Sequence, residues 1–328
     1  LNVTTGTSNT LIGGFAGDAL TTGIHNIAIG RNALSTEDAH GYNVAIGGYA
    51  LLTQNAGSDA YNIAIGYNSG QAITTGNYNT LIGGSSGDAL TTGARNIAIG
   101  NHALGAEDAH GRNVAIGYEA LKVQDAGADA YNVAVGYQAG LDLTSGINCV
   151  LVGRGAGENV TTGGTNTCVG AKAGDALTEG SNNILIGYNA AASAVDVDNE
   201  ITLGDSNISA FRCADQSIAA LSDGRDKSEV EESPYGLEFI NKLKPVKFTW
   251  NFRPEHMSEA KQGKSRVGFI AQDLQEAMPN NDNDVLDLVY EISENRLEAK
   301  YGNLIPVMAK AIQELSAEVK ELKKQING

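Results

Sequence analysis

A glycine that closes a short apolar run recurs along the first two thirds of the chain, nearly always seventeen positions after the previous one. The series is Gly13, Gly30, Gly47, Gly66, Gly83, Gly100, Gly117, Gly136, Gly153, Gly170, Gly187 and Gly204. Only two steps differ, from Gly47 to Gly66 and from Gly117 to Gly136, and each is longer by two positions. A unit this short cannot enclose its own core, so the repeat predicts a β-solenoid, or β-roll, in which neighbouring turns cover one another.

The residues before each glycine predict a strand. The third residue before it is β-branched in all twelve turns, and the residue directly before it is Ile, Val or Leu. This period of two is typical of a strand, and the two positions share a face. We expect this apolar stripe to be covered by neighbouring turns and by other chains. A roll with so little aromatic mass per turn would be marginal alone, so we expect a trimer.

Asparagine occupies the fourth position before the glycine in ten of the twelve turns, and Cys149 and Glu200 are the exceptions. Stacked in register, identical amides can hydrogen-bond from turn to turn, as in cross-β assemblies. The pattern predicts an asparagine ladder along the solenoid.

A larger unit is duplicated within the repeat. Residues 11–66 and 81–136 are identical at 39 of 56 positions. The two longer turns carry the loops QNAGSDAYN and QDAGADAYN, where a receptor or glycan contact would be expected on a rigid rod.

The pairs Glu37 with His40 and Glu107 with His110 could bind a metal or take part in acid-base chemistry. Because duplication explains their recurrence without a function, we predict no metal and no cofactor.

The net charge and the length of the apolar runs narrow the classes of partner. The formal net charge is -16, which argues against nucleic acid and anionic membranes as partners. The apolar runs are far shorter than the roughly 20 residues that span a bilayer, and we expect no membrane insertion.

The odd set of Cys149, Cys168 and Cys213 lacks metal-ligand spacing and is typical of structural thiols. Because the chain begins with Leu1, we expect a processed N-terminus or a longer parent protein.

The composition changes near residue 216. Before it, 7 basic residues face 19 acidic ones; after it lie the other 15 basic residues and all five prolines. We predict a solenoid over residues 1–204, a linker over 205–221 and an α+β domain over 222–328. In that domain we expect a helix at GLEFINKL, a strand at KPVKFTWNF, a strand and short helix at RVGFIAQDLQEAMP, and a hairpin at LDLVYEISENRLEAKY.

The last segment, from Asn303 onward, predicts a helix with a coiled-coil seam. Apolar residues recur at alternating spacings of four and three: Met308, Ile312, Leu315, Val319, Leu322 and Ile326. This seam of nearly three heptads is too short to hold a coiled coil alone, and we expect it to contribute to a trimer held elsewhere.

Four ordered motifs in the second region resemble a known family. They are S-D-x-R-x-K from residue 222, L-K-P-V-x-F-x-W, G-F-I-A-Q-D, and Y-x-N-L-I-P-V-x-x-x-A-I-Q-E-L. Together they resemble the intramolecular chaperone, or peptidase S74, domain that closes phage tailspikes and fibres. The resemblance implies a C-terminal domain that brings three chains into register and then releases itself with a Ser/Lys dyad.

Carried onto this sequence, the resemblance places the nucleophile at Ser222 and the lysine at Lys227, with Asp223 and Arg225 completing the motif. The scissile bond is expected between Leu221 and Ser222, with cleavage after Ser222 as the minor option. A lysine activates a serine only as a neutral amine, which burial on trimer formation would favour.

The repeats, with the pattern N-x-[AL]-I-G, resemble the head repeats of trimeric autotransporter adhesins and similar repeats of phage tail fibres. The leading hypothesis is therefore a homotrimeric virion tail fibre, assembled in the host cytoplasm, with a self-cleaving chaperone. The alternative is a trimeric adhesin whose rod recognises host surface glycans and keeps its chaperone domain. No other enzymatic activity is expected, because paired carboxylates beside aromatic platforms are not evident.

Overall fold

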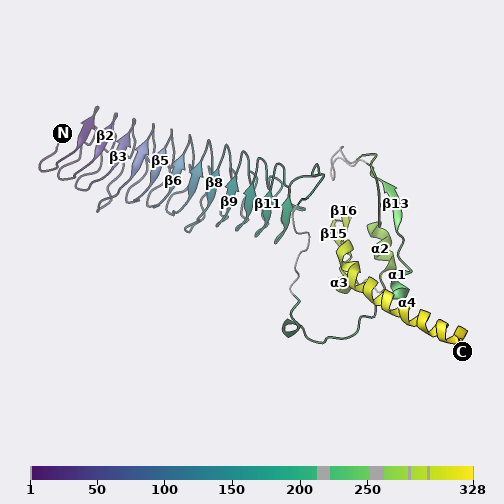
Figure 1. Ribbon diagram of the computed structural model, residues 1–328. Coiled ribbons are helices and arrows are strands. Elements are labelled where there is room, and N and C mark those ends of the chain that lie inside the picture. The colour runs from purple at the N-terminus through teal and green to yellow at the C-terminus, as the bar shows by residue number, and fades with distance from the viewer. Residues whose placement is uncertain (1, 213–221, 252–261, 280–281, 294–295, 328) are drawn as a thin grey trace. The chain divides into compact units, whose positions relative to one another are not determined.

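The computed structural model describes residues 2–212, 222–251, 262–279, 282–293 and 296–327 (Figure 1). The chain forms two compact units, Leu1–Asp205 and Ser206–Gly328. Two residues named above, Cys213 and Leu221, lie outside the described residues. Among the described residues, no helix has both the length and the apolar character needed to cross a bilayer.

The first unit is a β-solenoid, as the repeat predicts. Each glycine-closed run forms one three-residue strand, and the twelve strands make one parallel sheet in chain order. Figure 1 shows them stacked one after another. Pairing is in register with the repeat, so Thr10 lies opposite Ile27 and Ile27 opposite Val44. The strands are β1 (Thr10–Ile12), β2 (Ile27–Ile29), β3 (Val44–Ile46), β4 (Ile63–Ile65), β5 (Thr80–Ile82), β6 (Ile97–Ile99), β7 (Val114–Ile116), β8 (Val133–Val135), β9 (Val150–Val152), β10 (Thr167–Val169), β11 (Ile184–Ile186) and β12 (Ile201–Leu203).

The side of the strand that faces inward differs from the expectation. The two β-branched positions do share a face, but that face points outward: Ile27 and Ile97 are 37% and 38% exposed. The middle residues, such as Ala28 and Ala98, are fully buried instead. Turns of the same chain therefore cover the middle residue and leave the apolar stripe on the outside.

Large and small residues compensate one another inside each turn. Where the middle of the strand is Leu, as at Leu11, the fourth residue after the glycine is Gly17, and a Cβ there would lie 2.8 Å from Leu11 Cδ2. Where the middle is Ala, as at Ala28, the same position carries a buried leucine, such as Leu34, in four of six turns. The exceptions have Gly70 and Gly140 there, and leucines of the neighbouring turns reach these glycines. The exchange within a turn and between adjacent turns fills the interior, as close packing requires.

The repeating glycine is required by the next turn of the solenoid. Gly100 has φ +137°, and a Cβ on it would lie 2.2 Å from the carbonyl oxygen of Gly117. The backbone conformation and the close approach of the next turn both exclude a side chain at this position.

The asparagine ladder exists, but it runs through the backbone rather than from amide to amide. Asn26 Oδ1 accepts a hydrogen bond from the N–H of Asn43 at 3.0 Å, and Asn26 Nδ2 donates to the carbonyl oxygen of His40 at 2.9 Å. The side-chain oxygen of every ladder asparagine accepts an N–H of the following turn, and most of the side-chain amides donate to a carbonyl of that turn. Cys149 and Cys168 are buried in the same interior, and burial raises the pKa of Cys168 to about 12, as expected of a structural thiol.

The second unit has the predicted α+β character. Its elements are η1 (Gly224–Asp226), α1 (Leu237–Ile240), β13 (Val246–Thr249), β14 (Ser265–Gly268), α2 (Ala271–Ala277), α3 (Asn283–Leu286), β15 (Val289–Ser293), β16 (Arg296–Ala299), η4 (Tyr301–Asn303) and α4 (Leu304–Asn327). Strands β13 and β14 pair antiparallel, as do β15 and β16. The helix expected at GLEFINKL is confirmed but spans only one turn. A core around Phe239, Leu274 and Leu288 joins these elements to the start of α4.

Helix α4 has two sets of apolar residues, one buried and one exposed. Leu304, Val307 and Ala311 are buried against the rest of the unit. The predicted seam lies next to this buried stripe on the helix, and its six residues are between 40% and 80% exposed: Met308, Ile312, Leu315, Val319, Leu322 and Ile326. The single chain therefore leaves the coiled-coil face of α4 in solvent.

Candidate functional site

The Ser222 and Lys227 side chains are in contact. Lys227 Nζ donates a hydrogen bond to Ser222 Oγ at 2.7 Å. Between them lies the single 3-10 turn η1, whose N-cap is Asp223. Because the turn reverses the chain, two residues five apart in sequence bring their functional atoms together.

Asp223 and Arg225 hold this turn. Asp223 Oδ1 accepts from the backbone N–H of Arg225 at 2.9 Å, and the Arg225 guanidinium forms further bonds to the carboxylate. These bonds from Arg225 keep the pKa of Asp223 below its ordinary value. The acid and the guanidinium of the motif therefore neutralise each other and shape the loop between the serine and the lysine.

The Ser222 and Lys227 side chains are exposed in the single chain. A lysine can take a proton from a serine only as a neutral amine, and removal from water favours that form. In the single chain, Lys227 contacts Ser222, but its amine is not removed from water. Leu221, whose carbonyl the serine is expected to attack, lies outside the described residues.

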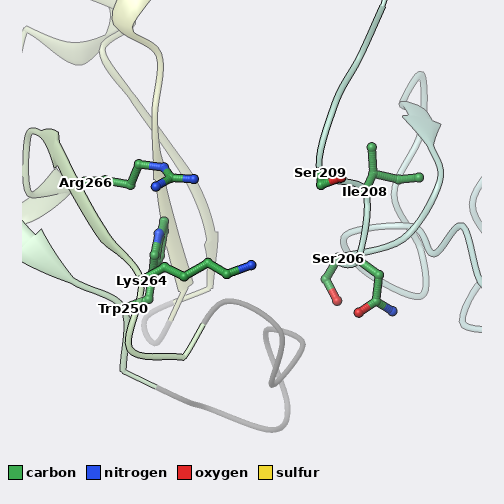
Figure 2. Close-up of a pocket in the computed structure, with 7 residues that line it drawn as sticks. Ser206, Ile208, Ser209, Trp250, Lys264 and Arg266 are labelled. Carbon is green, nitrogen blue, oxygen red and sulfur yellow. The ribbon is translucent and has the colours of Figure 1, made fainter.

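The β13–β14 hairpin presents an aromatic and two basic side chains close together. The backbone N–H of Trp250, just after β13, donates to the carbonyl of Lys264 at 3.0 Å. Figure 2 shows the side chains of Trp250, Lys264 and Arg266 lying close together on the wall of a pocket of this unit. A second, largely apolar groove of about 410 Å³ lies between β14 and α4, lined by residues such as Val267, Phe269 and Met308.

An aromatic row on the solenoid was missed by the sequence analysis. It occupies the fifth position before the repeating glycine, where the backbone is left-handed in every turn of the row. Stacked rings follow one another: His25 and Tyr42 with centroids 5.1 Å apart, Tyr42 and Tyr61 at 4.9 Å, and Tyr61 and Tyr78 at 5.3 Å. The row continues as Arg95, Arg112 and Tyr131, with Arg95 over Tyr78 and Arg112 over Tyr131. Aligning the repeats on their glycine would have revealed this column.

The two wide loops are tied to the preceding turn. Asp59 Oδ1 accepts from the N–H of Gly41, and Asp129 Oδ1 accepts from the N–H of Gly111, both at 3.0 Å. A contact of these loops with a receptor stays a prediction. Their tyrosines, Tyr61 and Tyr131, belong to the aromatic row.

Two groups of acidic and histidine side chains lie close enough to hold a cation. One comprises Glu107, Asp108, His110 and Asp125, and the other Glu37, Asp38 and His40. Burial raises the pKa of Glu107 above its ordinary value.

Comparison with known families matches residues 222–283 to the peptidase S74 family model, described as the chaperone of endosialidase. The match begins at Ser222 and includes Lys227 and the first three motifs of the domain. No curated protein and no solved structure matches the chain. A β-solenoid followed by this domain fits a tail fibre with a C-terminal chaperone.

Proposed function

We propose that this tail-fibre-like chain, with its chaperone-of-endosialidase domain, assembles as a homotrimer in which that domain aligns three chains and then cuts itself off. The observation that supports cleavage is the 2.7 Å contact between Lys227 Nζ and Ser222 Oγ, at the first residue of the matched segment. The fibre would be part of a virion tail, assembled in the host cytoplasm.

The cleavage step follows from these two side chains. Ser222 Oγ attacks the Leu221 carbonyl carbon as Lys227 accepts the hydroxyl proton. The Leu221–Ser222 amide bond breaks, the Ser222 nitrogen takes up a proton, and an ester joins Leu221 to the serine oxygen. Water then hydrolyses this ester and leaves a free Leu221 carboxylate. Because the dyad is exposed in the single chain, the reaction waits until partner chains cover Lys227 and remove it from water.

Two apolar surfaces support trimer formation. The seam of α4 is exposed along its whole length, and the outward stripe of the solenoid includes exposed residues such as Ile63 and Ile184. Contiguous exposed apolar surface of this kind marks protein contacts. A register shift of one solenoid turn nearly repeats the same surface, so a terminal domain that aligns three ends removes the ambiguity. Once that domain is released, the fibre is kinetically trapped.

Cleavage is tested by mass measurement and a denaturing gel of the full chain. Wild type should yield two fragments, Leu1–Leu221 and Ser222–Gly328. Ser222→Ala and Lys227→Met should remain intact while still forming trimers. Ser233→Ala, which alters another exposed serine of the same unit, is the matched control and should cleave normally. If wild type stays intact in its trimeric form, the protease assignment fails and the chaperone assignment stands.

The aromatic row favours a second function, recognition of host surface glycans by the solenoid. Tyrosines, apolar at one end and polar at the other, are enriched at binding surfaces, and Tyr42, Tyr61 and Tyr78 present a continuous row of partly exposed stacked rings. The expected result is saturable binding of the full chain on a glycan array, weakened at least about tenfold by Tyr61→Ala with Tyr78→Ala. Tyr188→Ala removes an exposed tyrosine from a different position of the turn and should have no effect. Equal binding by all three proteins would remove the row from consideration.

A further inference from the structure

The seventh residue after the repeating glycine is buried in the solenoid interior in the ten turns that begin at Gly13 to Gly170. Six turns have aliphatic side chains there: Leu20, Ile73, Leu90, Leu143, Val160 and Leu177, all fully buried. Two turns have Gln54 and Gln124 at this position, and two have Glu37 and Glu107, which are also fully buried. An acid in a column of leucines requires a physical explanation, since burying an uncompensated carboxylate is costly.

Hydrogen bonding satisfies only half of the Glu107 carboxylate. Oε1 accepts from the N–H of His110 at 3.0 Å, whereas the buried Oε2 has no hydrogen-bond partner among the described residues. Within the same described part of the chain, His110 Nδ1 is likewise buried without a partner and lies 3.6 Å from Glu107 Oε1, too far for a hydrogen bond. Two side chains in contact thus each leave a buried polar atom without a partner among the described residues, and a single cation would satisfy both.

Two exposed acids complete the group. Ligand atoms of Asp108 and Asp125 lie within 4.8 Å of each other and of those of Glu107 and His110. Asp125 comes from the wide loop of the following turn, so the group joins two turns. Zinc bonds of about 2.0–2.1 Å require these atoms to close by about an ångström, which the exposed aspartates allow.

We propose that Glu107, Asp108, His110 and Asp125 bind one divalent first-row transition metal ion per chain. The imidazole favours such a metal over magnesium or calcium, and the carboxylates supply the hard ligands. The ion links the segment of residues 107–110 to the wide loop of the next turn and so fastens two turns of the solenoid together. The repetition of the Glu-Asp-Ala-His segment is explained by duplication alone; the buried, half-satisfied Glu107 is not.

The duplicated copy provides an internal control. Glu37 Oε1 accepts from the N–H of His40 at 3.0 Å, and Glu37 Oε2 and His40 Nδ1 are also buried without partners among the described residues. Asn55, however, stands where the second copy has Asp125. The first copy thus has one carboxylate fewer and should bind the same ion more weakly.

The direct test is calorimetric titration of the EDTA-treated, untagged full chain with ZnCl2. Wild type should bind one Zn²⁺ tightly, with MgCl2 giving no comparable signal. Glu107→Gln should abolish this site without disturbing the fold, because Gln54 and Gln124 occupy the same position in other turns. Asp125→Asn, which recreates the first copy, should weaken it at least about tenfold. Asn55→Asp should produce a second tight site, and His25→Gln, outside both groups, should leave binding unchanged.

Thermal unfolding supplies an independent readout. Saturating Zn²⁺ should raise the Tm of wild type by several degrees, since a ligand that binds only the folded state stabilises it. Glu107→Leu places a leucine where Leu20 and Leu90 stand in other turns, and its Tm should not respond to Zn²⁺. Identical Zn²⁺ affinity or an identical Tm response in wild type and the Glu107 variants would overturn the proposal.

Discussion

At the scale of single residues, glycine is required at positions where neighbouring backbone or side-chain atoms leave no room for a Cβ. Gly100 faces the Gly117 carbonyl, Gly17 faces the Leu11 side chain, and each would collide if it carried a Cβ. These glycines are thus determined by contacts within one turn or between adjacent turns. A contact-determined glycine is expected to tolerate no substitution, unlike one on an open corner.

Gly100→Ala should lower the free energy of unfolding by about 3 kcal/mol, through strain at positive φ and the clash with the next turn. Urea unfolding followed by circular dichroism measures the change. Gly14→Ala is the control, because a Cβ on Gly14 meets no atom within 4 Å. It should shift stability by less than about 0.5 kcal/mol. Similar losses in both variants would contradict this account of the repeat.

At the scale of elements, the asparagine ladder holds successive turns in register. Each amide oxygen accepts one backbone N–H of the next turn, and most amides also donate to a backbone carbonyl of that turn, as Asn79 does with Asn96 and Gly93. The N–H of Cys149 donates to the Asn132 side chain, but the Cys149 thiol offers no amide oxygen to the turn that follows. The ladder is therefore weakened at Cys149.

Cys149→Asn should raise the Tm of the solenoid, because it restores the amide at this position. The new buried hydrogen bond should add about 1 kcal/mol to the free energy of unfolding. Asn79→Ala should lower the Tm and reduce the free energy of unfolding by about 1–3 kcal/mol, because it leaves backbone groups without partners. Differential scanning calorimetry of both variants checks the pair. A lower Tm for Cys149→Asn would mean that the pocket at this turn is too small for the amide.

At the scale of the whole molecule, the exposed apolar surfaces support the proposed trimer. The inner face of α4, with Val307 and Ala311, is used within the chain, while the seam remains available. Because the seam residues are exposed, they can be altered without replacing Val307 or Ala311. Substitution on the seam tests association without removing the core contacts of the domain.

Ile312→Glu should reduce the proposed trimer to monomer or weaken its association by at least about tenfold, because it places a charge in an apolar seam. Size-exclusion chromatography with light scattering reports the subunit number. Gln313→Glu adds the same charge at the neighbouring exposed position of α4 and should leave the assembly intact. An unchanged trimer in Ile312→Glu would show that the seam does not hold the chains together.

Much of the fold was predictable from local pattern. The period of the glycines, the three-residue strands and the long C-terminal helix all depend on residues close in sequence, and each is found where expected. The motif around Ser222 and Lys227 was identified by resemblance to a family, and the family match begins at that serine. The aromatic row was readable in the aligned repeats, since it occupies one column, but its stacking depends on the left-handed corner of each turn.

The sequence alone determined the repeat, because strand alternation inside so short a repeating unit has few structural solutions. Only the tertiary structure decided which face of each strand is inside, since alternation specifies two faces without saying which one packs. It also decided that Lys227 reaches Ser222 and that Asp125 lies beside Glu107. Such contacts depend on the path of turns and loops between residues, which composition and spacing do not specify.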